Sequence, residues 1–404
     1  MKVTNFSHIA NETFMTHARL EGLNLDILRN RKSEKWNTYP PEILPAWVAE
    51  MDFPLAEPIR EYLEQATGEG DVGYPIDPTT TGVREAFSKR MEEHFEWPID
   101  PHQVEILSEV VQGIYLGLMA FARPGTGAVV QTPIYPPFLH ALKDTGVRLA
   151  ENQLQPKASG WEIDFDQLNE LAKEPLSVFL LCNPQNPTGR AYGRTELEQL
   201  AEFALRNNLI VISDEIHADL VFDGRKHIPF ASLSPEVSAL TVTLNSASKS
   251  FNIPGLRCAV AHFGDPSVQK RFAETTPRHS RGGLGILGIY ASVVAWQRGD
   301  PWLREVREHL QSNRDHLCEQ LAARIPSVRI LSPQATYLAW LDCSDLKLQP
   351  SPARFFLKHG QVALSEGKNF GEDFGDFVRV NFATSRKILD DVIDRMVAAL
   401  NASG

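Results

Sequence analysis

Between residues 104 and 263 the chain repeats one pattern, in which short apolar segments alternate with helical stretches. The segments are rich in β-branched residues and almost uninterrupted by polar ones, as expected of strands buried on both faces. Strand–helix–strand order of this kind predicts an α/β fold, with a mostly parallel sheet flanked by helices. The predicted strands are GAVVQT, SVFLLC, LIVIS, LTVTL and CAVAHF.

The length of the chain and a change of pattern along it predict its division into domains. At 404 residues the chain is too long for one simple core. Beyond residue 285 helices dominate, around 302–324 and 386–400, with the short strands YLAWLD and FVRVNF between them. We therefore expect an N-terminal segment 1–55 that packs on the functional site and the small domain, a large domain 56–285, and a smaller α+β domain 286–404.

Charge and cysteine content narrow the function classes. The formal net charge of −11 is spread along the chain, without the basic stripe that binds nucleic acid. No apolar run could span a bilayer, and the first residues lack the apolar core of a secretory signal. The four cysteines are far apart, which argues against a disulfide framework or a zinc site. We expect a cytoplasmic protein that handles small molecules, with no membrane, nucleic-acid or metal partner.

One lysine follows the end of a predicted strand. Lys249 stands in NSASKSFNIPGLR, directly after LTVTL, with Ser246 and Ser248 before it and Arg257 after it. A lysine in such a loop can be desolvated, which favours a neutral amine able to attack an aldehyde. The hydroxyls and the guanidinium can hold a phosphate dianion. Alone, a lysine beside serines is a common surface feature and carries little weight.

Three other predicted strands also end in polar or aromatic residues. Asp214 closes the apolar strand of VISDEIH, where it could cap a helix or pair with a protonated ring nitrogen. Asn186 follows another strand in CNPQNPTGR, a sequence that also suits a turn. Tyr135, in QTPIYPPF, is free to stack on a flat ring. Ligands collect at this edge of open α/β sheets, so we expect these side chains to meet.

Five motifs in order resemble the fold type I pyridoxal-phosphate aminotransferase superfamily over nearly the whole chain. They are Y-P-P-F, N-P-x-N-P-T-G-R, S-D-E-I-H, S-x-S-K and a late F-V-R-V-N. Three further stretches resemble bacterial C–S lyases of the cystathionine β-lyase type: SEKW, AWVAEMDFP and ATYLAWLD. The resemblance implies pyridoxal 5′-phosphate as cofactor and a small-molecule amino acid as substrate.

The same resemblance implies roles around the cofactor ring. Lys249 would bind the cofactor as a Schiff base and later act as the base at the substrate Cα. Asp214 would contact the pyridine nitrogen, and Tyr135 would stack on the ring. Asn186 and His217 would lie near the ring hydroxyl.

Further implied roles concern the phosphate, the substrate and a second subunit. Arg379 would pair with the substrate carboxylate, beside Asn186 and the backbone at Val48 and Ala49. Tyr74 would reach the phosphate of the neighbouring subunit, so a homodimer is implied. The implied phosphate ligands within one chain are Ser246, Ser248, Arg257 and the backbone N–H groups of Val111 and Gln112.

Departures from the lyase pattern bear on the substrate. Glu50 stands where the lyases usually carry Asp, and Glu109 where they carry a small residue; both indicate an altered pocket and a specialised substrate. Pro254 stands where a small residue is more usual after the lysine loop. His217 stands where many aminotransferases carry Tyr and the lyases often carry His, so it favours the lyases. The leading hypothesis is a C–S β-lyase that releases a thiol, pyruvate and ammonia. An aminotransferase is the alternative, and a cofactor-binding regulator without catalysis is a remote third.

Three local patterns are interpreted without assigning a function to them. Gly283, Gly285 and Gly288 spell G-x-G-x-x-G, but no strand precedes them, so they predict a glycine-rich start of a helix rather than a nicotinamide site. His309 and His316 lie seven apart on a charged helix, and we expect them on a solvated face. The third pattern is a capping-box spacing, Thr195 and Glu198, at the start of the helix between the second and third strands.

Overall fold

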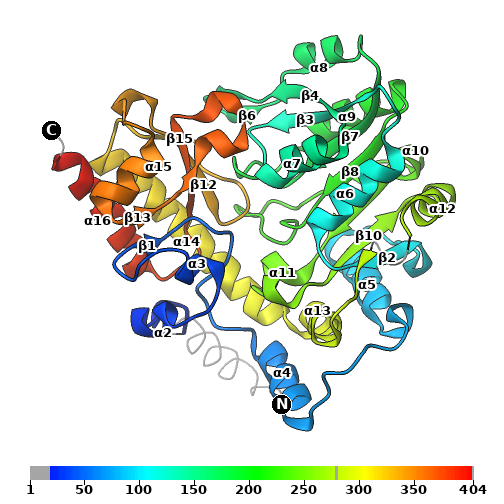
Figure 1. The fold of residues 1–404 in the computed structure, drawn as a ribbon, viewed down its shortest axis with the longest axis horizontal. Helices are drawn as coiled ribbons and strands as arrows, with labels where there is room; N and C mark the ends of the chain where they lie inside the picture. The colour runs from blue at the N-terminus through cyan, green and yellow to red at the C-terminus, as the bar shows by residue number, and fades with distance from the viewer. Residues whose placement is uncertain (1–18, 278–280, 403–404) are drawn as a thin grey trace, which may run out of the picture.

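The computed structural model describes residues 19–277 and 281–402, which contain a seven-stranded sheet (Figure 1). Its strands are β2 (Val104–Leu107), β3 (Gly127–Thr132), β4 (Arg148–Gln153), β7 (Leu176–Cys182), β8 (Ile210–Asp214), β9 (Thr241–Asn245) and β10 (Ala259–Phe263). They lie in the order β2-β10-β9-β8-β7-β3-β4. Every pair from β9 to β4 is parallel, whereas β10 is antiparallel to both neighbours. The prediction of a mostly parallel sheet is confirmed, and all five predicted segments are strands of it.

Helices cover both faces of this sheet. They are α6 (Val110–Phe121), α7 (Pro136–Thr145) and α12 (Pro266–Thr275) on one face, and α8 (Phe165–Leu171), α9 (Arg194–Arg206) and α10 (Pro235–Ala239) on the other. Successive side chains of a strand point to opposite faces. Val130 and Ile212 accordingly pack in the first core, and their neighbours Val129 and Val211 pack in the second. Both faces are buried, which explains why the strands are uninterrupted apolar runs in the sequence.

The start of α9 corrects one expectation. The helix begins at Arg194, and its N-terminal cap is Gly193, whose N–H donates to the Glu196 Oε2 atom at 2.8 Å. The predicted capping box of Thr195 and Glu198 is therefore wrong by two residues. Glycine has no side chain to act as the capping acceptor, so the sequence pattern pointed to the nearest threonine instead.

A second, four-stranded sheet lies in the C-terminal part of the chain. Its antiparallel strands, in the order β11-β12-β15-β14, are β11 (Arg329–Ile330), β12 (Leu338–Asp342), β15 (Phe377–Asn381) and β14 (Ser365–Glu366). The nearby helices are α13 (Ile286–Arg298), α14 (Asp300–Arg324), α15 (Pro352–Phe355) and α16 (Arg386–Asn401). The two predicted long helices and both predicted strands are confirmed.

Details of α13 and α14 test the remaining motif predictions. Gly285 caps α13, so the glycine-rich start of a helix is confirmed. Gly288 lies within α13, where a Cβ atom would come 2.0 Å from the Leu256 carbonyl oxygen, so this glycine permits close packing. The expectation that His309 faces solvent is wrong: it is 5% exposed, and its Nε2 lies 3.0 Å from the Thr384 carbonyl oxygen. A charged helix surface does not reveal which of its faces meets a later part of the chain.

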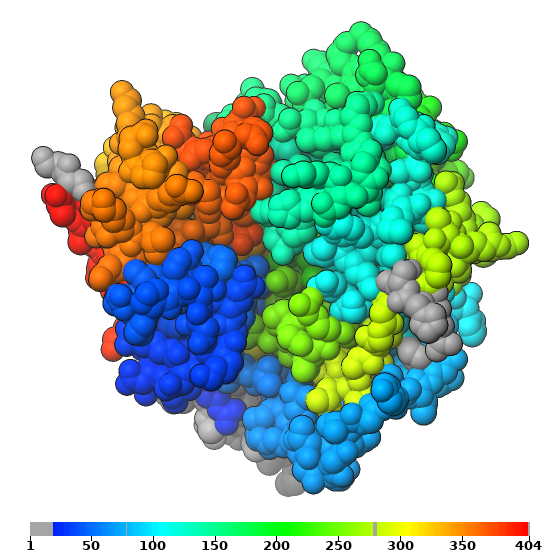
Figure 2. All heavy atoms as spheres, in the orientation of Figure 1, coloured from blue at the N-terminus to red at the C-terminus, as the bar shows by residue number. Residues whose placement is uncertain are grey.

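The N-terminal elements pack on the C-terminal part of the chain and on α13 (Figure 1). They are α2 (Leu25–Arg29), α3 (Glu34–Asn37), β1 (Leu44–Pro45), α4 (Glu57–Glu69) and α5 (Val83–Phe95). Strand β1 pairs in parallel with β13 (Val362–Ala363), so segments far apart in the sequence lie side by side. In Figure 2 the blue N-terminal atoms lie directly against the orange C-terminal ones. Across the described ranges, no helix combines the length and the apolar character needed to cross a membrane.

Candidate active site

Four neighbouring strands bring the predicted residues to one edge of the seven-stranded sheet. Asp214 is the last residue of β8, and Asn186 follows the end of β7. Tyr135 follows β3 and caps α7, while Lys249 lies in the short helix α11 (Ala247–Ser250) just after β9. Because β9, β8, β7 and β3 are adjacent and parallel, their carboxyl ends meet. The expected meeting of these side chains is confirmed.

These side chains line a pocket with a volume of about 440 Å³. Most residues that the sequence singled out lie in its wall. They are Ala49, Val111, Tyr135, Asn186, Asp214, His217, Ser246, Ser248, Lys249 and Arg257.

Three singled-out residues lie apart from this wall. Arg379 joins the site through Asn186, to whose Oδ1 atom it donates at 3.0 Å. Gln112 turns its side-chain amide to the Arg281 carbonyl oxygen, at 2.7 Å, so only its backbone remains available to the pocket. Tyr74 is fully exposed, and its own chain does not bring it to the pocket.

The Lys249 amine is held by main chain from the N-terminal part. Its Nζ atom donates to the Ala49 carbonyl oxygen at 2.8 Å. Burial, and after it the charge of Arg379, lowers the pKa of Lys249 to about 8, although the nearby Asp214 acts in the opposite direction. A larger fraction of neutral amine is therefore present near neutrality than for an exposed lysine. The neutral amine is the form that attacks carbonyl carbons and accepts protons.

Asp214 is a buried acid that lacks a cationic contact. The Ile216 N–H donates to its Oδ1 atom at 3.1 Å, but none of the ion pairs among the described residues includes Asp214. Burial raises the pKa of Asp214 to about 7. Burial also lowers the pKa of His217 to about 3, so this histidine is neutral, and its Nδ1 atom has no hydrogen-bond partner within the described ranges. These two groups are suited to a ligand that brings its own N–H and hydroxyl groups.

Arg379, on β15, is a buried cation without a carboxylate partner in the described part of the chain. Its Nη2 atom donates to the Trp47 carbonyl oxygen at 2.9 Å and to the Ser365 hydroxyl at 3.2 Å. Burial lowers the pKa of Arg379 to about 10, which leaves it charged near neutrality. Its Nε–H group has no hydrogen-bond partner within the described ranges and is available to the carboxylate of a small molecule.

The pocket suits an anion at the end where helix α6 begins. The N–H groups of the first turn of α6 have no partner within the helix. Arg257 reaches the same place and pairs with Glu109, the residue that caps α6. The Ser246 hydroxyl donates to the Cys258 carbonyl oxygen at 2.6 Å, so its single proton is already committed. The Ser248 hydroxyl lines the pocket.

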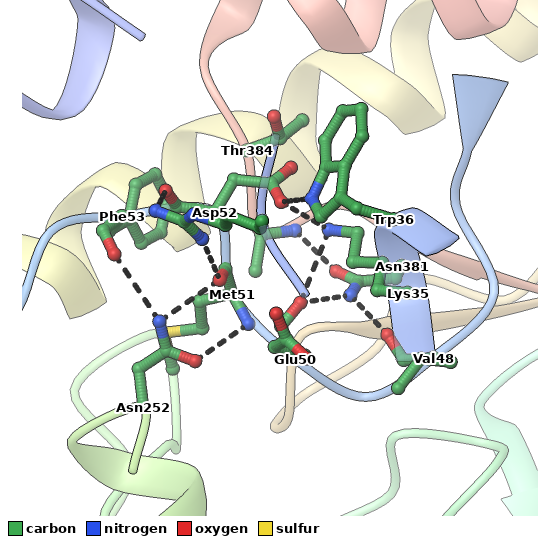
Figure 3. Close-up of polar contacts among 12 residues, drawn as sticks. Lys35, Trp36, Val48, Glu50, Met51, Asp52, Phe53, Asn252, Asn381 and Thr384 are labelled. Atoms are coloured by element: carbon green, nitrogen blue, oxygen red, sulfur yellow. Dashed lines mark hydrogen bonds and ion pairs between the residues drawn. The ribbon is translucent and has the colours of Figure 1, made fainter. Parts of the chain in front are cut away.

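Residues 46–53, here called the 46–53 loop, carry the Ala49 carbonyl and rest on a buried ion pair (Figure 3). Lys35 Nζ lies 2.8 Å from Asp52 Oδ1, and both side chains are 1% exposed. Lys35 also donates to the Glu50 carbonyl oxygen at 3.2 Å, and the Trp36 indole N–H donates to Asp52 at 2.8 Å. Breaking such a pair leaves an unpaired buried charge, so it fixes the loop strongly.

Side chains from elsewhere in the chain hold the main chain of the 46–53 loop. Asn252 exchanges two hydrogen bonds of 2.9 Å with the backbone of Met51. Asn381 donates to the carbonyl oxygens of Val48 and Glu50, at 2.6 and 2.7 Å (Figure 3). The Tyr337 hydroxyl donates to the Ala49 carbonyl oxygen at 2.9 Å, beside the Lys249 amine.

The network around the 46–53 loop was missed as a set of functional contacts, although its sequence signal was present. Lys35 and Trp36 lie in SEKW, Asp52 lies in AWVAEMDFP, and Tyr337 lies in ATYLAWLD. These three stretches served only to mark a family resemblance. In the structure they contact one another or the loop that holds Lys249, which gives the resemblance a physical basis.

The chain matches the family model described as aminotransferase class I and II over residues 49–396. It belongs to this family. Cystathionine beta-lyase PatB of Bacillus subtilis (strain 168) is 35% identical over 366 residues, which span 89% of this chain and 93% of that protein.

Solved structures share the fold of this chain. The crystal structure of OvoB is 37% identical, with a TM-score of 0.87 over 93% of this chain and 97% of that one. A putative PLP-dependent beta-cystathionase from Corynebacterium diphtheriae is 32% identical, with a TM-score of 0.89 over 94% of this chain and 98% of that one. The fold type I architecture expected from the motifs is therefore confirmed.

Proposed function

We propose that this chain is a pyridoxal 5′-phosphate-dependent C–S β-lyase, which converts a cystathionine-like cysteine S-conjugate into a thiol, pyruvate and ammonia. The observation that carries the proposal is the buried Lys249 amine, which faces the same pocket as the unpaired Asp214 carboxyl. The names of PatB and of the diphtherial beta-cystathionase support the lyase over the aminotransferase.

The polar and aromatic groups of the pocket wall match the parts of the cofactor one by one. Lys249 would hold its aldehyde carbon covalently, and Asp214 would accept a hydrogen bond from its pyridine N–H. Tyr135 would lie on its ring, with Asn186 and His217 near its hydroxyl group. The phosphate would bind at the start of α6, with Ser248, Arg257 and the backbone N–H groups of Val111 and Gln112. Ser246 would join these ligands once its hydroxyl turned away from the Cys258 carbonyl. When bound, the protonated ring withdraws electrons from the substrate Cα and stabilises negative charge there.

The residues of this chain supply the remaining chemistry. Arg379 binds the substrate carboxylate and so turns the Cα–H bond toward Lys249. Lys249, as a free amine of lowered pKa, accepts the Cα proton. The Asp214 carboxylate holds a proton on the ring nitrogen, and its own burial makes that charge pair strong. With the proton gone from Cα, a thiolate can leave from Cβ.

Product analysis tests the proposal directly. Purified protein loaded with the cofactor is given L-cystathionine, and, in a separate reaction, an L-amino acid with a keto-acid acceptor. Free thiol and pyruvate in equal amounts are expected from the first reaction. Amino-group exchange without thiol release would identify an aminotransferase and refute the lyase. Cofactor binding with no turnover in either reaction would identify a regulator.

The proposal includes a homodimer in which Tyr74 completes the neighbouring site. Its support is an exposed apolar stretch: Tyr74 is fully exposed, and Val72 and Ile76 are 59% and 62% exposed. Mixing inactive Lys249→Ala with weakly active Tyr74→Ala protein tests it. Exchange of subunits should restore roughly a quarter of wild-type activity, since one site in four is intact in a random mixture. No recovery, despite proven exchange, would contradict the role of Tyr74.

Two further parts of the proposal concern organisation and location. We propose boundaries near residues 55 and 285, supported by the seven-stranded sheet within 104–263 and the four-stranded sheet within 329–381. We also propose a cytoplasmic location, supported by four free cysteines, three of them buried. Limited proteolysis tests the boundaries, and fractionation of the source cells tests the location.

A further inference from the structure

The charges that line the pocket do not balance once the proposed function is assigned. Arg257 and Glu109 pair with each other at the start of α6, where the proposed function places the cofactor phosphate, so both belong to that end of the pocket. Lys249 and Asp214 are committed to the cofactor by the proposed function. Of the charged residues in the wall, this leaves two carboxylates, those of Glu34 and Glu50.

These two carboxylates are free to meet a ligand. Neither one takes part in an ion pair with another described residue. Glu50 is half-buried and Glu34 exposed, so they lie at different depths of the wall. Ser33, beside Glu34 in the same wall, has a buried hydroxyl that lacks a hydrogen-bond partner within the described ranges. Polar groups left unpaired in this way favour a polar ligand over an apolar one.

The backbone of Glu50 is fixed rather than mobile. Its carbonyl oxygen accepts hydrogen bonds from Lys35 and Asn381, at 3.2 and 2.7 Å (Figure 3). The neighbouring Ala49 carbonyl holds the Lys249 amine. The Glu50 carboxylate therefore starts from a position one residue away from the reacting centre. A carboxylate carried so near the reacting centre makes the sign of the charge on a substrate matter for selectivity.

We propose that Glu50, assisted by Glu34, selects cysteine S-conjugates whose leaving thiol carries a positive charge. The inference rests on the proposed lyase activity and adds a substrate class to it. The α-carboxylate of such a substrate is bound by Arg379, and its sulfur substituent extends toward the two glutamates. A cation there gains an attraction that a neutral substituent lacks, and an anion meets repulsion.

Three substrates of similar size test this selectivity. S-(2-aminoethyl)-L-cysteine ends in an ammonium group, S-propyl-L-cysteine replaces that group by a methyl, and S-(2-carboxyethyl)-L-cysteine ends in a carboxylate. The aminoethyl conjugate is expected to exceed the propyl conjugate in kcat/KM by about tenfold, and the carboxyethyl conjugate to be the poorest. The preference should reside in KM, since the charge acts on bound substrate and transition state alike. It should also shrink in 0.5 M salt.

Variants assign the preference to a residue. Glu50→Gln is expected to lower the aminoethyl-to-propyl ratio about fivefold, and Glu34→Gln by less, because Glu34 is more exposed. Glu50→Asp should keep the preference. Glu42→Gln is the matched control, since Glu42 is an exposed carboxylate of the same segment outside the pocket wall. Thermal unfolding of each variant shows whether it is folded.

The outcomes separate this inference from the function beneath it. If neither the three conjugates nor L-cystathionine releases a thiol, the lyase proposal itself fails. If L-cystathionine is cleaved and none of the three conjugates is, the lyase stands and the charge selectivity is overturned. If all are cleaved with equal kcat/KM, or the carboxyethyl conjugate is preferred, the lyase stands and the charge selectivity is overturned. A preference that survives in Glu50→Gln and Glu34→Gln alike would assign it to other residues and also overturn the proposal.

Discussion

The edge of the seven-stranded sheet and the 46–53 loop both contact Lys249, but they hold their groups by different means. At the sheet edge, Asp214 takes its place from the main-chain ladder of parallel strands, and Asn186 from a hydrogen-bonded turn directly after β7. In the loop, the Ala49 carbonyl takes its place from side chains that arrive from elsewhere, above all the ion pair of Lys35 and Asp52. The sheet edge is therefore insensitive to most single substitutions around it, whereas the loop depends on a few specific side chains.

Removing the amine where the two regions meet has the largest expected effect. Lys249→Ala should abolish the visible absorbance of lysine-bound cofactor and lower kcat by at least about a thousandfold, because nucleophile and base are lost together. Absorbance spectra and thiol release measure this. Lys270→Ala, at an exposed lysine, is the control and should leave both intact. Retained colour and activity in Lys249→Ala would refute the central assignment.

Breaking the ion pair of Lys35 and Asp52 has the next largest expected effect. Asp52→Leu leaves Lys35 as an unpaired buried charge, and should lower the free energy of unfolding by about 3–5 kcal/mol. The double variant Lys35→Met/Asp52→Leu should recover most of that stability, yet still show reduced kcat, because the Ala49 carbonyl loses its support.

Urea denaturation and steady-state kinetics together test the role of this pair. The exposed pair of Lys226 and Glu96 serves as the control, and the corresponding double variant should change stability by no more than about 1 kcal/mol. If the stable Lys35→Met/Asp52→Leu protein has wild-type kcat, the pair only stabilises the fold and does not position the loop.

Arg379 connects the two regions, since it donates both to Asn186 at the sheet edge and to Trp47 in the loop. Arg379→Ala is expected to raise KM by about a hundredfold, because the substrate carboxylate loses its charged hydrogen-bond partner in a buried site. Arg206→Ala, at an exposed arginine away from the site, provides the comparison. An unchanged KM in Arg379→Ala would mean that another group binds the carboxylate.

The smallest expected effect is a dependence of stability on pH, and it concerns the sheet edge alone. Without cofactor, the folded pKa of Asp214 is about 7, above its ordinary value of 3.8, so its buried charge destabilises the folded state above pH 7. This penalty fades as pH falls from 7 toward 4. Cofactor-free Asp214→Asn should therefore be more stable than wild type by about 2 kcal/mol at pH 8, and no more stable at pH 4. Urea midpoints at the two pH values measure it, and a pH-independent difference would contradict the assignment.

The same comparison explains what could be predicted from the sequence. Strands buried on both faces are continuous apolar runs, so β3, β7, β8, β9 and β10 were found, and with them the residues at their ends. The contact of Lys35 with Asp52 joins residues that are close in the chain, but Asn252 and Asn381 reach the loop across 201 and 331 residues. Nothing in the local pattern of an asparagine reveals a partner at that distance. The burial of His309 likewise depends on a partner far along the chain, Thr384. The cap of α9 was missed because Gly193 has no side chain that a sequence pattern could reveal.

The pairing of β1 with β13 has a consequence for the order in which the site can come into being during synthesis. The sheet edge needs nothing beyond residue 263, so its side chains can gather while the ribosome is still at work. The 46–53 loop must wait for Tyr337, β13 and Asn381, which are translated much later. A nascent chain therefore carries Lys249 well before it can seat the Ala49 carbonyl against the Lys249 amine, and the complete pocket arrives only with the last part of translation.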